Sequence, residues 1–279
     1  MCIRDRIQRL AAFSNGNEGG NPAGVALFDK LPSTAEMQQT AADVGYSETA
    51  FAEPLGSGYR VRYFSPGSEV PFCGHATIAL GAALARVHGN NIFELTLNEA
   101  TITVEGTVSS DEMNAALQSP PTFSRPAELS LLDPALALFG LHNDDLDARI
   151  PPAFAHAGAN HLVLFLKSRQ QLRDMAYKLI DGKKWMDKEN LVTVLLGYVE
   201  SEQRFHTRNA FASGGVFEDP ATGAATAALA GYLRDLNWPH DHHINVVQGE
   251  DMGSKSLLNA SFTDKPGTSI RVEGTVRDI

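Results

Sequence analysis

The chain has 279 residues, of which 43% are hydrophobic and 20% charged, so it can bury a substantial core in one large or two medium domains. Its net charge of −10 argues against nucleic acid as the main partner, because phosphate binding requires a basic surface. Its two cysteines exclude a disulfide scaffold, and no apolar run approaches the ~18 residues of a membrane span.

The opening residues carry no signal-peptide pattern, since no apolar stretch follows their charges. We therefore expect a cytoplasmic protein without membrane contact. Residues 1–6 fit the following strand poorly, so we interpret them as non-native and give Cys2 no weight.

Elements of both kinds alternate in the first half of the chain. Ser33 and Glu36 form a capping box that predicts a helix to about Val44, ended by Gly45. A second, Ala-rich helix is predicted from Gly74 to Val87. Apolar or alternating patterns predict strands at 25–28, 49–52, 60–64, 92–97 and 101–105.

The proline-rich segment after Ser119 is the best linker candidate. We therefore predict an N-terminal lobe at 1–118, a linker at 119–130 and a C-terminal lobe at 131–279, with the last strand crossing back to the first lobe. In the second lobe, Asp133-Pro134 predicts a helix start, and an Ala-rich helix is expected at 221–236. Strands are predicted at 161–166, 191–199, 204–208, 244–247, 257–262 and 269–276.

The two halves repeat one pattern. Arg62 leads through a glycine-containing loop to Cys73 and an Ala-rich helix, and Arg208 leads to Asp219 and another, with the same spacing of 73 − 62 = 219 − 208 = 11. A duplication predicts two similar lobes, each a sheet around one helix, with a binding cleft between them.

Gly74 and Gly223 lie near the starts of the two Ala-rich helices. The first N–H groups of a helix have no internal partner and carry partial positive charge, so they can hold a carboxylate and stabilise an enolate. The alternative is two ordinary helix starts, with Asp219 as N-cap and Pro220 at the first helical position.

Glu48 lies between a turn and an apolar strand. Partial burial there would raise its pKa and suit it to transfer a proton near neutral pH, whereas the alternative is a surface glutamate. His75 is expected in the first helical turn, as a neutral catalytic imidazole or a structural histidine. Cys73 precedes that helix and is either a reactive thiol or a small packing residue.

No metal or nucleotide site is predicted. The histidines of Pro239-His-Asp-His-His243 lack a second ligand cluster and are interpreted as a solvated loop. No glycine-rich dinucleotide motif, P-loop or nucleophile elbow is present.

Four motifs in order resemble the phenazine-biosynthesis isomerase-like family over nearly the whole chain. They are Gly20-Asn-Pro-Ala-Gly-Val25, Ser47-Glu-Thr49, Cys73-Gly-His-Ala-Thr77 and Glu218-Asp-Pro-Ala-Thr-Gly223. The resemblance implies an α+β protein of the diaminopimelate-epimerase fold, with two pseudo-symmetric lobes, each a mixed sheet or barrel around a central helix. It also implies a homodimer and no cofactor.

By motif position, the resemblance makes Glu48 the acid/base, with His75 and Asp219 as its catalytic partners. It places Ser47, Gly74, Gly223 and Asn21 at the substrate. Ala224 stands where a serine is common, so a hydroxyl contact is lost while its backbone N–H remains. Cys73 stands where related amino-acid racemases carry a catalytic thiol.

The resulting hypothesis is a cofactor-independent isomerase that moves a proton on a small anionic metabolite, with its site between the lobes. One alternative is an amino-acid racemase or epimerase that uses Cys73 as a base. Another is a small-acid-binding protein that has lost the chemistry.

Overall fold

The computed structural model describes residues 6–110 and 112–279, so Cys2 lies outside the described residues. Contacts divide the chain into two compact units. The first contains the described residues up to Gln118 together with Glu273–Ile279, and the second contains Ser119–Val272. Among the helices of the described residues, none combines the length and apolarity needed to span a bilayer.

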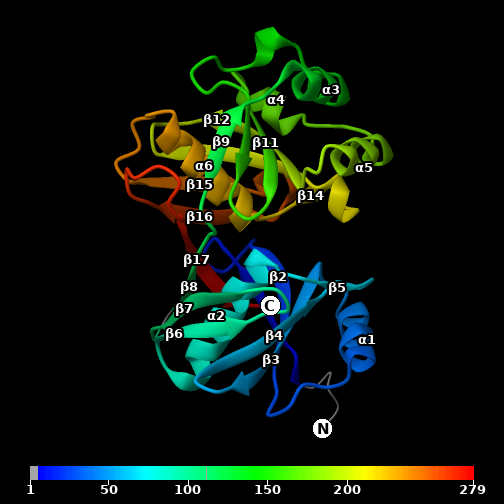
Figure 1. Ribbon diagram of the computed structural model, residues 1–279, viewed down its shortest axis with the longest axis vertical. Coiled ribbons are helices and arrows are strands. Elements are labelled where there is room, and N and C mark those ends of the chain that lie inside the picture. The colour runs from blue at the N-terminus through cyan, green and yellow to red at the C-terminus, as the bar shows by residue number, and fades with distance from the viewer. Residues whose placement is uncertain (1–5, 111) are drawn as a thin grey trace. The chain divides into compact units, whose positions relative to one another are not determined.

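Eight strands of the first unit close into a barrel (Figure 1). Hydrogen-bonded neighbours follow the order β17, β1, β2, β3, β4, β6, β7 and β8, and β8 pairs again with β17. The strands are β1 (Gln8–Ala12), β2 (Asn21–Leu27), β3 (Glu48–Leu55), β4 (Gly58–Phe64), β6 (Asn91–Thr96), β7 (Thr101–Val108), β8 (Met113–Gln118) and β17 (Arg271–Asp278), with β5 (Glu69–Val70) beside β4. The barrel thus takes its closing strand from the end of the chain.

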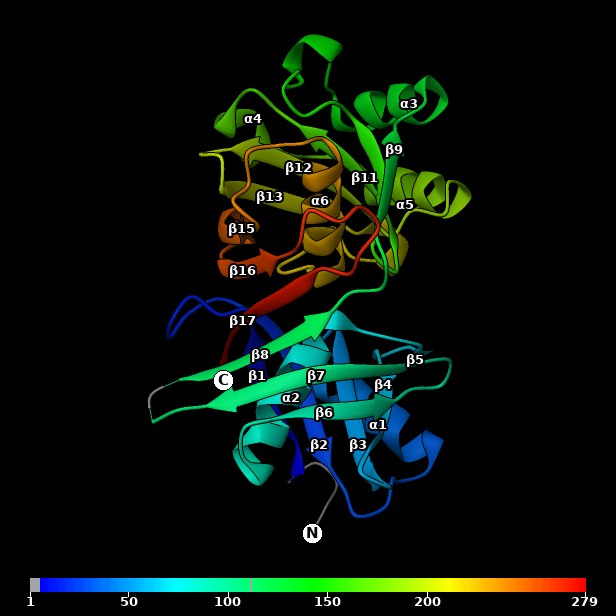
Figure 2. The same cartoon turned by 60° about the vertical axis from the view of Figure 1, so that its left-hand side comes forward.

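Helix α2 (Gly74–His88) is the core of this barrel, and β6, β7 and β8 lie side by side next to it (Figure 2). Every residue from His75 to Ala85 is buried, as the run of alanine and leucine predicts. Small side chains let the strands come close. A Cβ on Gly106 of β7 would lie 2.1 Å from the carbonyl oxygen of Gly81 in α2.

Gly106→Ala is therefore expected to destabilise the first unit by on the order of 1–3 kcal/mol, because the added methyl meets helix backbone that cannot rotate away. Hydrogen exchange of β7 and α2, followed by mass spectrometry, measures the loss. Gly67→Ala is the control, since a Cβ there has no neighbour within 4 Å among the described atoms. Equal protection in both variants would contradict this packing.

Helix α1 (Thr34–Val44) packs against β3 and β4. Its predicted capping box is confirmed: the Ser33 hydroxyl accepts from the Glu36 N–H at 3.3 Å, and the Glu36 carboxylate accepts from the Ser33 N–H at 2.9 Å. Gly45 ends the helix with a φ of 74°. The chain then enters β3 at Glu48.

The second unit has a mixed sheet in the order β9, β10, β11, β12, β13, β15, β16, with β14 added beside β13. The strands are β9 (Phe123–Pro126), β10 (Ala153–His156), β11 (Asn160–Phe165), β12 (Thr193–Val199), β13 (Arg204–Ala210), β14 (Glu218–Asp219), β15 (His243–Gln248) and β16 (Ser256–Ser261). Helix α6 (Gly223–Asp235) packs against β9, β10, β11, β15 and β16, and its residues 225–234 are all buried. The outer helices are α3 (Leu129–Phe139), α4 (Arg169–Arg173) and α5 (Leu179–Lys188).

Two expectations for this unit are wrong. Residues 119–130, expected as a linker, contain β9, which pairs with β10. Helix α3 begins at Leu129, so Pro134 lies inside it and not at its start. The buried face that includes Leu131, Leu132 and Leu136 continues past the proline, and its packing outweighs one lost backbone hydrogen bond.

The duplication is visible in the strand pairing. In each unit, a glutamate on a short strand pairs with the residue two positions after an arginine on the neighbouring strand. The arginine and glutamate are Arg62 of β4 and Glu69 of β5 in the first unit, and Arg208 of β13 and Glu218 of β14 in the second. Each glutamate precedes the first residue of its central helix by five positions.

When the two units are aligned on these glutamates, Asp219 does not correspond to Cys73, although their equal spacing from the arginines predicts that it does. Cys73 is the N-cap of α2, and the N-cap of α6 is Thr222 rather than Asp219. The loop between β13 and β14 is three residues longer than its counterpart (218 − 208 = 10 against 69 − 62 = 7), so equal spacing from the arginine aligns different positions. Asp219 therefore matches Val70 of the first unit.

His161 on β11 gives the second unit a pH-dependent stability. Its side chain is fully buried and its Nδ1 lies 2.8 Å from the Thr193 hydroxyl, and desolvation lowers its pKa to about 3. Between the unfolded pKa of about 6.5 and the folded value, the unfolded chain binds the extra proton, so acid favours unfolding by about 1.4 kcal/mol per pH unit.

We expect the stability of the native protein to fall by about 2 kcal/mol more than that of His161→Gln between pH 7 and pH 5. Urea unfolding followed by tryptophan fluorescence measures this, because Trp185 and Trp238 both lie in the second unit. The same pH dependence in both proteins would contradict a neutral, buried His161.

Candidate active site

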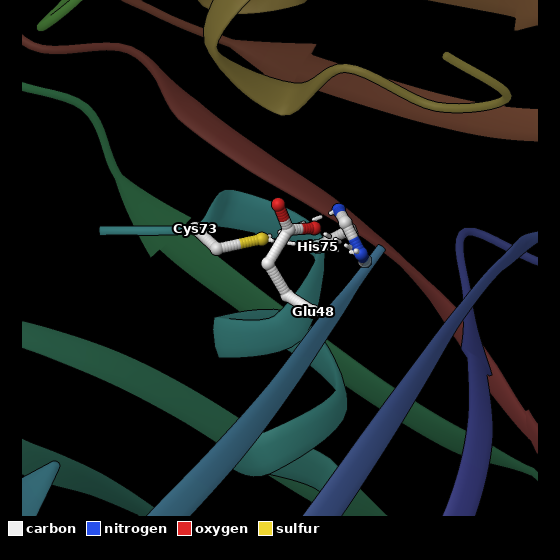
Figure 3. Close-up of side chains that lie close together, drawn as sticks. All are labelled: Glu48, Cys73 and His75. Atoms are coloured by element: carbon white, nitrogen blue, oxygen red, sulfur yellow. Dashed lines mark hydrogen bonds and ion pairs between the residues drawn. The ribbon is translucent and has the colours of Figure 1, made fainter. Parts of the chain in front are cut away.

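The barrel brings three of the predicted side chains together at the N-terminus of α2 (Figure 3). Glu48 is the first residue of β3, Cys73 is the N-cap of α2, and His75 lies in the first turn of that helix. Their side chains point toward one another, and their ligand atoms all lie within 4.8 Å of each other. Residues 25 positions apart in sequence thus form one cluster.

The His75 ring is at the centre of the contacts. Its Nε2 lies 3.4 Å from the Glu48 carboxylate and 3.2 Å from the Ser47 hydroxyl. Its Nδ1 lies 3.4 Å from the Cys73 sulfur. The Glu48 side chain is 15% exposed and the His75 side chain 7%, so the carboxylate is partly buried and keeps some contact with solvent.

Backbone N–H groups of the α2 first turn lie beside this cluster. Gly74, the first residue of the helix, has open space where a Cβ would be. Amides of a helix start favour an anion there. Asn21 is the first residue of β2 and is buried. It lies two residues before Ala23, which pairs with Glu48 of β3.

A chain of hydrogen bonds through Tyr63 and Thr77 holds the start of α2, and these two residues are not among those predicted for the site. The fully buried Tyr63 hydroxyl lies 2.7 Å from that of Thr77, which donates to the Cys73 carbonyl at 2.7 Å. Burial also raises the pKa of Tyr63 well above its ordinary value, so it remains a neutral donor. Thr77 is the last residue of the Cys73-Gly-His-Ala-Thr77 motif, so that motif is the sequence signal from which its structural role could have been predicted.

The other predicted residues lie in the second unit. Asp219 is in β14, and its carboxylate accepts from the Thr222 hydroxyl at 2.6 Å. It is not the N-cap of α6, and Pro220 lies outside the helix. Gly223 and Ala224 are the first two residues of α6. Their roles toward a substrate stay predictions.

A model of the family described as phenazine biosynthesis-like protein matches residues 10–276. The chain belongs to this family. It is 28% identical to trans-2,3-dihydro-3-hydroxyanthranilate isomerase of Pseudomonas fluorescens, over 95% of this chain and 92% of the relative. It is 26% identical to the uncharacterized isomerase YfhB of Bacillus subtilis, over 96% and 94% of the two chains.

Solved structures confirm the fold. A PhzF-family protein of Bacillus anthracis superposes with a TM-score of 0.86 at 22% identity, covering 98% of this chain and 96% of that one. A protein described as a probable proline racemase of Agrobacterium radiobacter gives a TM-score of 0.66 at 10% identity, covering 98% of this chain and 90% of that one. The prediction of a diaminopimelate-epimerase-like α+β fold is thus confirmed, and the chain is an enzyme of the isomerase class.

Proposed function

We propose that this isomerase moves a proton between carbons of a small carboxylate-bearing metabolite, with Glu48 as its acid/base. The observation that carries the proposal is the place of Glu48: a half-buried carboxylate next to His75 and the N-terminus of α2. A base needs to be near an anion site that can stabilise the charge its proton abstraction creates.

The reaction follows from this arrangement. The Glu48 carboxylate takes a proton from a carbon next to a carbonyl, carboxylate or double bond, and the electron pair of the broken C–H bond spreads into that group. The α2 amides hold the resulting negative charge. The protonated Glu48 then gives its proton to another carbon on the same face, and His75 orients the carboxylate through its Nε2, 3.4 Å away. No redox partner is needed.

Incubation of the enzyme with a pool of small carboxylic acids in D₂O tests this proposal. A substrate gains deuterium at one carbon because the Glu48 proton exchanges with solvent, and mass spectrometry identifies the acid. Compounds that resemble the substrate in the Pseudomonas fluorescens relative's name, cyclic hydroxy-amino acids with a carboxylate, belong in the pool. If no acid in the pool gained deuterium, that result would count against the proposal.

A second candidate is an amino-acid racemase or epimerase in which Cys73 is a base. The observation that favours it is the Cys73 sulfur beside His75 at the N-terminus of α2, an environment that activates thiols. Cys73→Ala separates the two: the glutamate mechanism retains exchange, whereas the thiol mechanism loses it. Alkylation alone cannot separate them, because a modified Cys73 also blocks Glu48.

We also propose that the partners are a small anionic metabolite and a second copy of the chain, as the family resemblance implies. Light scattering tests the dimer, and the deuterium assay tests the metabolite.

A further inference from the structure

Glu48, Cys73 and His75 offer the donor atoms that a metal site uses as well as those of an acid/base site. A thiol, an imidazole and a carboxylate lie within 4.8 Å of one another in the described chain. We propose that a thiophilic divalent cation such as Zn²⁺ binds these three side chains and switches off proton transfer. The inhibition rests on the function proposed above, whereas the binding does not.

A tetrahedral ion on the Nε2 atom of His75 sets the distances that the other two ligands must reach. Bonds of about 2.3 Å to sulfur, 2.05 Å to nitrogen and 2.1 Å to oxygen imply S···N near 3.6 Å and N···O near 3.4 Å. The structure has 3.9 Å between Cys73 Sγ and His75 Nε2, and 3.4 Å between Glu48 Oε2 and the same nitrogen. Because Cys73 Sγ also lies 3.4 Å from Nδ1, the sulfur stands beside the ring and not along the Nε2 lone pair, so ion binding requires rotation of the Cys73 or His75 side chain.

The donor chemistry selects the metal. Thiolate and imidazole favour zinc over magnesium or calcium, and a carboxylate completes a neutral set with a divalent ion. On binding, the Cys73 S–H bond gives its proton to buffer and an S–Zn bond forms. Three protein ligands leave a fourth position for water.

Metal binding and catalysis exclude each other. Glu48 cannot accept a substrate proton while its oxygen is bonded to the cation, and His75 Nε2 must leave its contact with Ser47, now 3.2 Å long. Inhibition therefore follows from occupancy of the site and needs no change of fold.

The chain contains its own comparison site. His240, His242 and Asp264 in the second unit also place three ligand atoms within 4.8 Å. The side chains of His242 and Asp264 are 57% and 75% exposed, against 7% and 15% for His75 and Glu48. That surface group has no thiol, so a thiolate signal distinguishes the two.

Titration of the full chain with Co²⁺ tests the proposal without a substrate. Cys2 is replaced by serine throughout, so a sulfur-to-cobalt charge-transfer band reports only Cys73. We expect the band in this protein and in its His242→Ala variant, and its loss in Cys73→Ser. Glu48→Gln and His75→Ala should each weaken binding by roughly 100-fold or more, since even outer-shell partners contribute about 10–100-fold.

Zn²⁺ should bleach the cobalt band and stop deuterium exchange, and a chelator should restore exchange. Absence of the band, or its persistence at full strength in Glu48→Gln and His75→Ala, would overturn the site. A band that forms while Zn²⁺ leaves exchange unchanged would overturn the inhibition. A protein that exchanges no acid even without metal refutes the proposed function and leaves the cobalt result valid by itself.

Discussion

Glu48→Gln is expected to lower the rate of substrate deuterium exchange by on the order of 10²–10⁴ while leaving the fold intact. Glutamine keeps the size of the side chain and its contacts at the start of β3, but it cannot take or return a proton at neutral pH. The exchange assay in D₂O measures the rate, and circular dichroism verifies the fold.

Glu53→Gln is the matched control, because Glu53 lies on the same strand and is also half-buried. Its carboxylate accepts from the Leu31 N–H at 2.6 Å and supports a loop. We expect exchange within a few-fold of the native rate in this variant. Native activity in Glu48→Gln would refute the assignment of the acid/base.

Glu218→Gln is expected to destabilise the second unit by about 3–5 kcal/mol, because it leaves Arg208 with an uncompensated buried charge. The Arg208 guanidinium donates to the Glu218 carboxylate at 3.0 and 2.5 Å, and the two side chains are only 8% and 2% exposed. Arg208 also donates to the Arg173 carbonyl at 2.7 Å, which holds part of its position. Urea unfolding followed by tryptophan fluorescence measures the loss.

The repeat supplies a comparison within the same chain. Arg62 donates to the Glu69 carboxylate at 2.8 and 2.6 Å, but these side chains are 19% and 25% exposed. The hydrogen bonds from Arg62 lower the pKa of Glu69. Because solvent screens this pair, Glu69→Gln should cost the first unit only about 0.2–1 kcal/mol. Hydrogen exchange of β4 measures the loss in the first unit, since both tryptophans lie in the second. Equal losses in the two variants would show that burial does not control the difference.

Much of the first unit could be predicted from local pattern. The capping box at Ser33 and the Ala-rich helix at Gly74 are local signals, and both helices form where predicted. The strand from Asn21 was only half predicted, since Asn21-Pro-Ala-Gly24 has turn propensity. It joins β2 because β1 and β3 pair with it on both sides. Pairing of this kind depends on segments that are distant in the sequence, so the local residue pattern does not predict it.

The same limit applies to the candidate site. Motifs predicted Glu48, Cys73 and His75 as separate residues, and the structure places their side chains within 4.8 Å. The loop between β13 and β14 misled the repeat alignment, because loop length varies more freely than strand register. The arginine–glutamate pairs identify the correct register, but they become visible only once β5 and β14 are paired with their neighbours.

A crystal structure of the Cys73→Ala enzyme soaked with an acid that exchanges in D₂O would show directly whether Glu48 reaches the reacting carbon. We expect the substrate carboxylate on the first-turn amides of α2, with the exchanging carbon about 3 Å from the Glu48 carboxylate. A substrate held elsewhere, with Glu48 out of reach of that carbon, would contradict this expectation.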